Sequence, residues 1–343
     1  HQVPLEMDIS TPFGAMLNEP PKIAGLREMF DGTTMNDIKG MHMLGPFNPN
    51  KIPLVLVHGL MSRPRTYAQM LNTLICDPRI RENYQFFMFA YPTGNPILYS
   101  AAQLRESLLE LRQRFDPEQK NKNFDNMVII GHSMGGLITR MMCQNVGKKL
   151  LRQFTDYDIE DFNLDPEDEQ LLKSMLVFDK VPFIDRAVFI SAPHRGSEIA
   201  QWSVSEWASS WITKPKQFLS TEEEVANKAM DKVKLPKGRE KPRFPTGIEN
   251  LRPDNNLIQY MIKVPIDPDI PYHSIIGDDE QAGSTKGTDG VVPYWSSHLD
   301  GAQSELVVKS GHNVQKTPAG IMEVERILIN HLREVGRIPK TKK

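Results

Sequence analysis

The sequence predicts an α/β protein in which helices cover both faces of a mostly parallel central sheet. Short and almost continuous apolar runs recur along the chain, which is typical of parallel strands buried on both faces. Helical patterns separate most of these runs. The chain has 343 residues, 39% of them hydrophobic and 24% charged, so it is long and apolar enough to bury a large core.

The elements are expected in the following order. Residues 1–51 form an N-terminal arm with a helical pattern near 23–30 and a first edge strand at 40–44. Residues 52–335 form one doubly wound domain. Six apolar runs supply its strands: IPLVLVHGL (52–60), YQFFMFAYP (84–92), NMVIIGHS (126–133), RAVFISAP (186–193), YHSIIG (272–277) and SELVVKSGH (304–312).

The clearest helices are predicted at 101–115, 134–154 and 318–335. Two stretches interrupt the alternation of strands and helices. Asp156 to Glu169 contains eight acidic residues and no basic one, which favours a solvated charged loop. Residues 197–252 form a longer insertion, and 336–343 form a basic C-terminal tail.

The charge and cysteine content exclude several classes of protein. Forty-one basic and 43 acidic residues give a net charge of −2, so no global field attracts nucleic acid or anionic lipid. No run approaches the roughly 18 uninterrupted apolar residues of a membrane span. Cys76 and Cys143 exclude a disulfide framework and leave a single bridge open. Because the chain begins at His1, we expect a processed or trimmed form.

A serine stands at the most informative turn of the sequence. The stretch VIIGHSMGGL (128–137) runs an apolar segment into Gly-His-Ser-Met-Gly and then into a helical pattern. This is the context of a nucleophile elbow, in which Ser133 occupies a strained strand-to-helix turn. Gly131 and Gly135 would let strand and helix approach closely. A chance Gly/Ser turn is the alternative, and the flanking patterns favour the elbow.

A serine hydroxyl needs a base to act as a nucleophile at neutral pH. Among nine histidines, His312 follows the last predicted strand and precedes the last helix, where the base of this topology belongs. His58 and His132 flank glycines in turns and are expected to serve structure. His194 follows a strand but lies early in the chain.

The acid that orients this base is expected in the loop before the last strand. That loop offers Asp278, Asp279, Glu280 and Asp289. Asp289 begins the turn DGVVP, whereas the two earlier aspartates end a strand directly and are equally consistent with solvated turn residues. Ser133, Asp289 and His312 then follow one another along the chain as nucleophile, acid and base.

Two backbone amides are the expected donors to an oxyanion. The run LVLVHGLMS (54–62) ends a strand with His-Gly-Leu, and a glycine there lets the backbone turn its amides toward the serine. The natural pair is the N–H of Leu60 and the N–H of Met134. One such donor can contribute about 3 to 4 kcal/mol in the transition state. The alternative is that His-Gly only ends the strand.

Taken together, LVLVHGL, IIGHSMGG, APHRGS, TDGVVP and SGH resemble a bacterial serine hydrolase of the α/β-hydrolase superfamily, of the esterase and lipase type. The resemblance covers about residues 52–335. It implies an α/β-hydrolase fold with a helical cap, and hydrolysis of carboxylic esters without a metal or an organic cofactor. It also implies an exported or cell-envelope location in a bacterium. The acidic stretch and the long insertion depart from the pattern, so no substrate preference is carried over.

The insertion at 197–252 occupies the place where α/β-hydrolases commonly carry a cap or lid over the active site. Burial of a large apolar side chain contributes about 1.5 to 3 kcal/mol, so an apolar helix face there must be covered. Such a face is formed by Val204, Trp207, Ala208, Trp211 and Ile212. Trp207, Trp211 and Ile212 either pack as core on the sheet edge or line an acyl-binding pocket. Contact of the cap with lipid or a membrane surface is a further hypothesis.

The resulting hypothesis is a carboxylic ester hydrolase that acts through Ser133, His312, Asp289 and an acyl-enzyme. Its substrates would be small-molecule or lipid esters with medium or long acyl chains. An acyltransferase with the same residues and a catalytically silent binding module are the alternatives. No His/Cys/carboxylate cluster has metal-ligand spacing, so neither a metal nor a cofactor is expected. The sequence leaves the oligomeric state open.

Overall fold

The structure, a computed structural model, describes residues 39–153, 156–162, 164–197, 253, 256–280 and 285–340. Seven strands form one sheet in the order β1-β3-β2-β4-β5-β6-β7. β1 runs antiparallel to β3, and every other neighbouring pair is parallel. The strands are β1 Gly40–Met43, β2 Ile52–Val57, β3 Tyr84–Ala90, β4 Met127–His132, β5 Ile184–Ile190, β6 Tyr272–Asp278 and β7 Ser304–Lys309.

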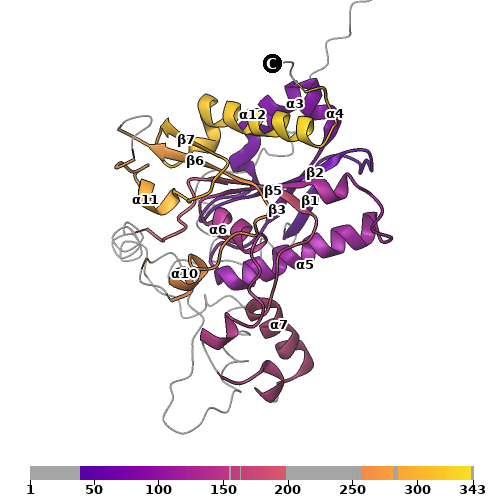
Figure 1. The fold of residues 1–343 in the computed structure, drawn as a ribbon, viewed down its shortest axis with the longest axis vertical. Helices are drawn as coiled ribbons and strands as arrows, with labels where there is room; N and C mark the ends of the chain where they lie inside the picture. Colours follow the sequence, from indigo (N-terminus) through magenta and orange to yellow (C-terminus); the bar gives the residue numbers. More distant parts are fainter. Residues whose placement is uncertain are drawn as a thin grey trace, which may run out of the picture.

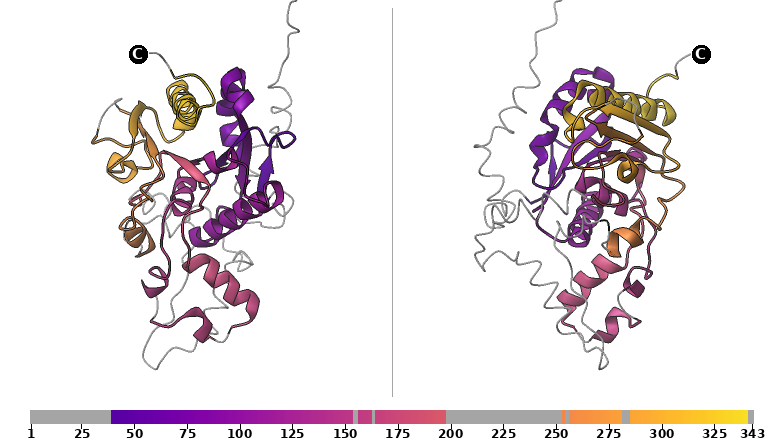
Figure 2. Two further views of the ribbon diagram at one scale, coloured as in Figure 1. Left: turned by 45° about the vertical axis from the view of Figure 1, so that its right-hand side comes forward. Right: turned by 90° about the vertical axis from the view of Figure 1, so that its left-hand side faces the viewer.

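Helices cover both faces of this sheet (Figure 1), and the turned views keep the sheet between the two layers (Figure 2). On one face lie α3 (Ala68–Cys76), α4 (Pro78–Asn83) and α12 (Pro318–Glu334). On the other lie α5 (Ile97–Phe115) and α6 (Met134–Met141). The other described helices are α7 Pro166–Leu176, α10 Asn256–Met261 and α11 Tyr294–Ser297, with 3-10 turns at Pro64–Tyr67, Phe124–Asn126, Leu151–Gln153, Ile159–Phe162 and Val314–Lys316.

The alternation of side chains along the strands builds both layers of the core. In β2, Val55 and Val57 pack into the cluster that contains α5 and α6. Leu54 and Leu56 point the other way, into the cluster with α3 and α12. All residues of β2 and β3 are buried, as parallel strands covered on both faces require. A sheet of this order, with one antiparallel edge and helices on both faces, confirms the predicted α/β-hydrolase fold.

Side-chain caps fix the starts of two helices. The carboxylate of Asp77 accepts a hydrogen bond from the Arg79 N–H at 2.8 Å before α4. The hydroxyl of Thr317 accepts one from the Gly320 N–H at 3.1 Å before α12. Each helix also begins with a proline, whose fixed φ suits the first helical position. The helix predicted at 318–335 is confirmed and ends one residue earlier, at Glu334.

The helix predicted at 134–154 is wrong in length, because α6 ends at Met141. The carbonyl oxygens of Met142 and Cys143 accept hydrogen bonds from the N–H groups of Val181 and Asp267, both at 2.8 Å. Distant segments thus take the acceptors that a longer helix would use. The helix predicted at 101–115 is confirmed, although α5 begins four residues earlier.

The acidic stretch at 156–169 is not a loop throughout, because α7 begins inside it at Pro166. Glu167, Asp168 and Glu169 occupy the first turn of α7, where negative charge stabilises the positive end of the helix dipole. Both cysteines are free, so the structure holds no bridge between Cys76 and Cys143. No described helix is long and apolar enough to cross a membrane.

Several predictions from the sequence lie outside the described residues. These are the helical pattern near 23–30 and, beyond Ser197, the cap at 197–252 with Trp207, Trp211 and Ile212.

Candidate active site

Ser133 stands at the turn between β4 and α6. Its φ of 55° and ψ of −128° lie in a region that residues other than glycine rarely adopt. Hydrogen bonds from Ser133 N–H to Ile190 O at 2.9 Å and from Gly136 N–H to Ser133 O at 2.8 Å hold the turn. A Cβ on Gly135 would lie 2.3 Å from Val57 O, so a side chain there would push α6 away from β2. This strained turn is the geometry predicted for an elbow.

One side chain from the C-terminal part of the chain contacts Ser133, and a second contacts the first. His312 lies in the loop after β7, and its Nε2 is 2.8 Å from Ser133 Oγ. The other ring nitrogen, Nδ1, is 2.8 Å from Oδ2 of Asp289, which lies in the loop after β6. The structure thus brings the three predicted residues together as hydroxyl, imidazole and carboxylate. Both distances are those of hydrogen bonds along which a proton can move.

The environment of Asp289 favours its ionised form. Burial by itself would raise the pKa of this carboxyl group. The hydrogen bond to His312, the charge of that imidazole and the N–H groups of Val292 and Val291 outweigh burial and lower the pKa. A carboxylate here holds the proton of the imidazole on Nδ1 and leaves the Nε2 lone pair toward Ser133.

The other predicted acids are placed differently. Asp278 is buried, its Oδ1 accepts the Glu280 N–H at 3.0 Å, and its carboxylate lies against Gly287. Asp279 is exposed, and its N–H donates to Thr288 O at 3.0 Å. Glu280 is exposed as well. Asp289 is therefore the carboxylate that stands within hydrogen-bond distance of the imidazole.

The loop after β2 lies directly beside the serine. A Cβ on Gly59 would stand 2.7 Å from Ser133 Cβ. The predicted donors Leu60 and Met134 directly follow Gly59 and Ser133 in the sequence, and in the part of the chain that the structure describes neither N–H is paired with an acceptor. The following amide, that of Met61, donates to the Thr93 hydroxyl at 3.1 Å. Two unpaired amides beside a nucleophile can receive an oxyanion.

Two of the remaining histidines are packed as neutral rings. His58 is fully buried and stacks on Tyr91 with ring centroids 4.5 Å apart, and burial lowers its pKa to about 4. His194 meets the ring of Phe189 edge to face at 4.8 Å, and burial lowers its pKa well below the ordinary value. The imidazole that contacts Ser133 Oγ belongs to His312.

His132 has a contact that the sequence did not predict. Its Nε2 lies 2.9 Å from the backbone carbonyl oxygen of His312, and the two ring centroids are 5.0 Å apart. The bond joins the last residue of β4 to a loop 180 positions later in the chain. Nothing in the sequence pattern indicates it, because the acceptor is a backbone atom.

Hydrogen bonds join the motif APHRGS (192–197) to the loop that carries Asp289 and to the short helix α11 after it. The Arg195 guanidinium donates to the carbonyl oxygens of Trp295, at 2.8 Å, and His298. The Ser197 hydroxyl donates to Val291 O, two residues from the acid. Additional bonds run from Arg195 N–H to Ser296 Oγ at 3.1 Å and from Ser297 Oγ to Ala192 O at 3.0 Å. The motif was noted in the sequence, but its structural role was not predicted.

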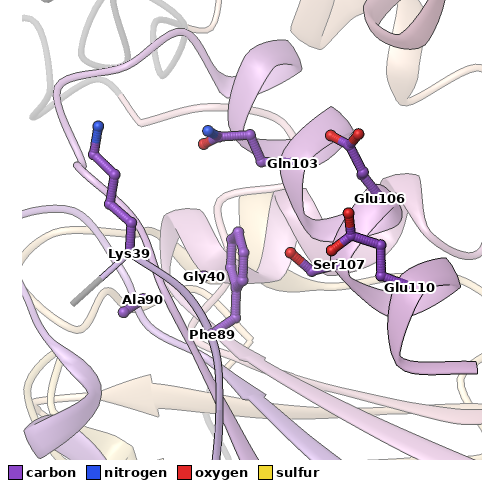
Figure 3. A pocket seen from close by; sticks show the side chains of 8 residues that line it. All are labelled: Lys39, Gly40, Phe89, Ala90, Gln103, Glu106, Ser107 and Glu110. Carbon is purple, nitrogen blue, oxygen red and sulfur yellow. The ribbon is translucent and has the colours of Figure 1, made fainter. Parts of the chain in front are cut away.

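Two further features of the described residues were compared with the candidate site, namely clusters of metal-ligating side chains and a hollow beside β1. No group of three or more His, Cys, Asp or Glu side chains among the described residues could hold a metal ion. A hollow of about 160 Å³ between β1 and α5 is smaller than the roughly 300 to 1,000 Å³ of a typical ligand site (Figure 3). It is lined by Lys39, Gly40, Phe89, Ala90, Gln103, Glu106, Ser107 and Glu110, and none of these is a candidate active-site residue.

Neither a protein-family model nor a curated protein matches this chain. Among solved structures, it is similar to the mature form of the Bacillus licheniformis lipase BlEst2, with 15% identity over 84% of this chain and 97% of that one and a TM-score of 0.48. It is similar to Staphylococcus hyicus lipase, with 13% identity, 86% and 99% coverage and a TM-score of 0.49. It is also similar to EstA from Clostridium botulinum, with 13% identity, 91% and 99% coverage and a TM-score of 0.46. Likeness at this level assigns no activity to the chain.

Proposed function

We propose that this chain is a serine ester hydrolase that forms an acyl-enzyme on Ser133. One observation carries the proposal: an unbroken line of hydrogen bonds runs from Ser133 Oγ through His312 to Asp289, with both contacts at 2.8 Å. Its serine end lies beside Leu60 and Met134, whose amides are unpaired among the described residues. These are the four components that acyl transfer to a serine requires.

In the first half of the reaction, His312 Nε2 takes the proton of the serine hydroxyl while Oγ attacks the ester carbonyl carbon. The Asp289 carboxylate stabilises the imidazolium that forms. The negative charge on the carbonyl oxygen is received by the N–H groups of Leu60 and Met134. Collapse of the tetrahedral intermediate breaks the bond to the alcohol oxygen, which leaves with the proton from His312.

In the second half, water takes the place of the alcohol. His312 removes a proton from the water as it attacks the acyl carbon, and the same two amides hold the oxyanion. The second collapse releases the carboxylic acid and returns the proton to Ser133 Oγ. The positions of the described residues suit each of these proton transfers without further ionisable groups.

The test compares wild-type protein with the Ser133→Ala variant. Wild-type protein is incubated with a fluorophosphonate probe and with p-nitrophenyl esters from acetate to palmitate, and Ser133→Ala is the control. We expect stoichiometric labelling of wild type, none of the variant, and a loss of kcat on the order of 10⁶. Absence of both labelling and hydrolysis in wild type would favour a silent binding module. Ester exchange that dominates over hydrolysis when an alcohol is added would favour an acyltransferase.

The preference for medium or long acyl chains is a finer part of the proposal. It rests on the apolar spacing of Trp207, Trp211 and Ile212 in the sequence. Contact of the cap with lipid rests on the same pattern.

A further inference from the structure

His132, the residue before the nucleophile, lies against both the loop of His312 and the loop of Gly59 and Leu60. His132 is 4% exposed, and its Nε2 is 2.9 Å from the backbone oxygen of His312. On its other side, a Cβ on Gly59 would lie 3.3 Å from His132 Nδ1, so the ring also borders the loop that carries Leu60. The imidazole of His132 therefore fills the space between the base loop and the predicted oxyanion loop.

The protonation state of His132 follows from its surroundings. Burial, and after it the charge of His312, lower its pKa to about 3, although the bond to the His312 carbonyl and the charge of Asp289 oppose this. The ring is therefore neutral at physiological pH. Because a carbonyl oxygen only accepts, the single proton must lie on Nε2. Nδ1 is then a bare acceptor, and it is buried with no partner among the described residues.

Three residues after the base, its loop is anchored by the buried Gln315, whose Nε2 donates to Thr66 Oγ1 at 2.7 Å. The Ser310 N–H donates to Asp278 O at 2.9 Å, and the Lys316 N–H donates to Asn313 O at 2.9 Å. A Cβ on Gly311 would meet only Asp289 O, at 3.6 Å, so the space around that residue is open. In the described chain, the hydrogen bond to the backbone of His312 itself comes from His132.

We propose that His132 is a positioning residue, whose donated hydrogen bond to the His312 carbonyl holds the base in line between Ser133 and Asp289. The inference rests on the proposed function, because a base needs positioning only where it transfers protons. The bond ties the loop of the base directly to the residue that precedes the nucleophile. A shift of β4 then moves nucleophile and base together and preserves the distance between them.

A loss of this bond should appear in turnover and not in substrate binding. Displacement of a reacting group by about 1 Å can cost about 100-fold in rate. We therefore expect His132→Phe, which keeps a planar ring and removes the donor, to lower kcat by about 10-fold to 100-fold with KM changed less than about 3-fold. Glutamine carries an amide N–H₂ at a reach similar to that of Nε2. His132→Gln should restore kcat to within about 5-fold of wild type.

A matched control separates positioning from stability. His273 is also buried and hydrogen-bonded, through Arg186 and Ser304, but it lies at the opposite end of its strand from the loop of Asp289. His273→Phe should lower the melting temperature and leave kcat unchanged. Each variant is measured with a p-nitrophenyl ester, its active sites are counted with a fluorophosphonate, and its melting temperature is recorded by circular dichroism.

The outcomes distinguish the inference from the function on which it rests. Wild type that neither hydrolyses esters nor takes up the probe overturns both. Active wild type together with a His132→Phe variant of equal kcat overturns the inference alone. The inference also fails if His132→Gln is as slow as His132→Phe at an unchanged melting temperature, because the donor would then not be the feature that matters.

Discussion

The contact between Gly59 and Ser133 gives a prediction whose size follows from the structure. A methyl group on Gly59 would stand 2.7 Å from Ser133 Cβ and 3.1 Å from His132 O, whereas ordinary contacts lie at 3.4 to 4 Å. The serine or the loop would have to move by the difference, about 0.7 to 1.3 Å. Since about 1 Å of misplacement can cost about 100-fold, Gly59→Ala should lower kcat/KM by about 100-fold, which corresponds to an increase of about 2.7 kcal/mol in the activation free energy.

The control for this prediction is Gly311→Ala, on the other side of the site. Its new methyl group would meet only Asp289 O, at 3.6 Å, which is an ordinary contact. Both variants are assayed with acetyl and butyryl p-nitrophenyl esters beside thermal unfolding, and we expect Gly311→Ala to stay within about 3-fold of wild type. If Gly59→Ala keeps more than a tenth of wild-type kcat/KM while it melts at the wild-type temperature, the proposed closeness of the loop to the nucleophile is refuted.

Three further predictions concern the acid, the buried histidines and the acyl chain. Asp289→Asn should lower kcat by about 10⁴ because an amide can hold the wrong imidazole tautomer, whereas exposed Asp279→Asn should have little effect; the reverse result in ester assays would reassign the acid. His58 and His132, with pKa values lowered to about 4 and about 3, bind fewer protons when folded than when unfolded. The free energy of unfolding therefore rises with pH up to about 6.5, and each of these two histidines should lower it by about 2 kcal/mol at pH 5 relative to pH 7.5. A free energy of unfolding, measured with urea, that falls by less than 1 kcal/mol between these pH values would contradict this. Trp211→Ala should lower kcat/KM more for palmitoyl than for acetyl esters, since each buried methylene contributes about 0.8 kcal/mol, and an equal loss along the series would assign Trp211 to the core.

Most of the fold could be predicted because its signals are local. Apolar runs that alternate with helical patterns predicted the parallel strands from β2 to β7, and the run at 40–44 predicted the edge strand. The turn at Ser133 was predictable for the same reason, since the glycines two positions before and after it are a constraint of close packing. The length of α6 was not, because its end depends on hydrogen bonds from Val181 and Asp267, far along the chain.

The contacts of the candidate site also fall into those that the sequence could predict and those that it could not. The expected positions of Asp289 and His312 followed from chain order and turn chemistry, and the structure places both side chains against each other. Two sets of hydrogen bonds were not predictable. His132 bonds to a backbone oxygen 180 residues away, and Arg195 donates to two backbone carbonyl oxygens. Backbone acceptors have no residue type that a sequence pattern could show.

The distribution of the site along the chain has a consequence for how the protein is made. Gly59 and Ser133 come from the first half of the sequence, while Asp289 and His312 flank β7 near its end. α12 follows His312 and buries its apolar face against the sheet. A domain generally folds as a unit, and all of these elements belong to one sheet. The serine turn depends on β5, through the bond from Ser133 N–H to Ile190 O, and the base depends on the docking of β7 and α12. A growing chain therefore gains the ability to activate the hydroxyl only when these segments have been made and have joined the sheet.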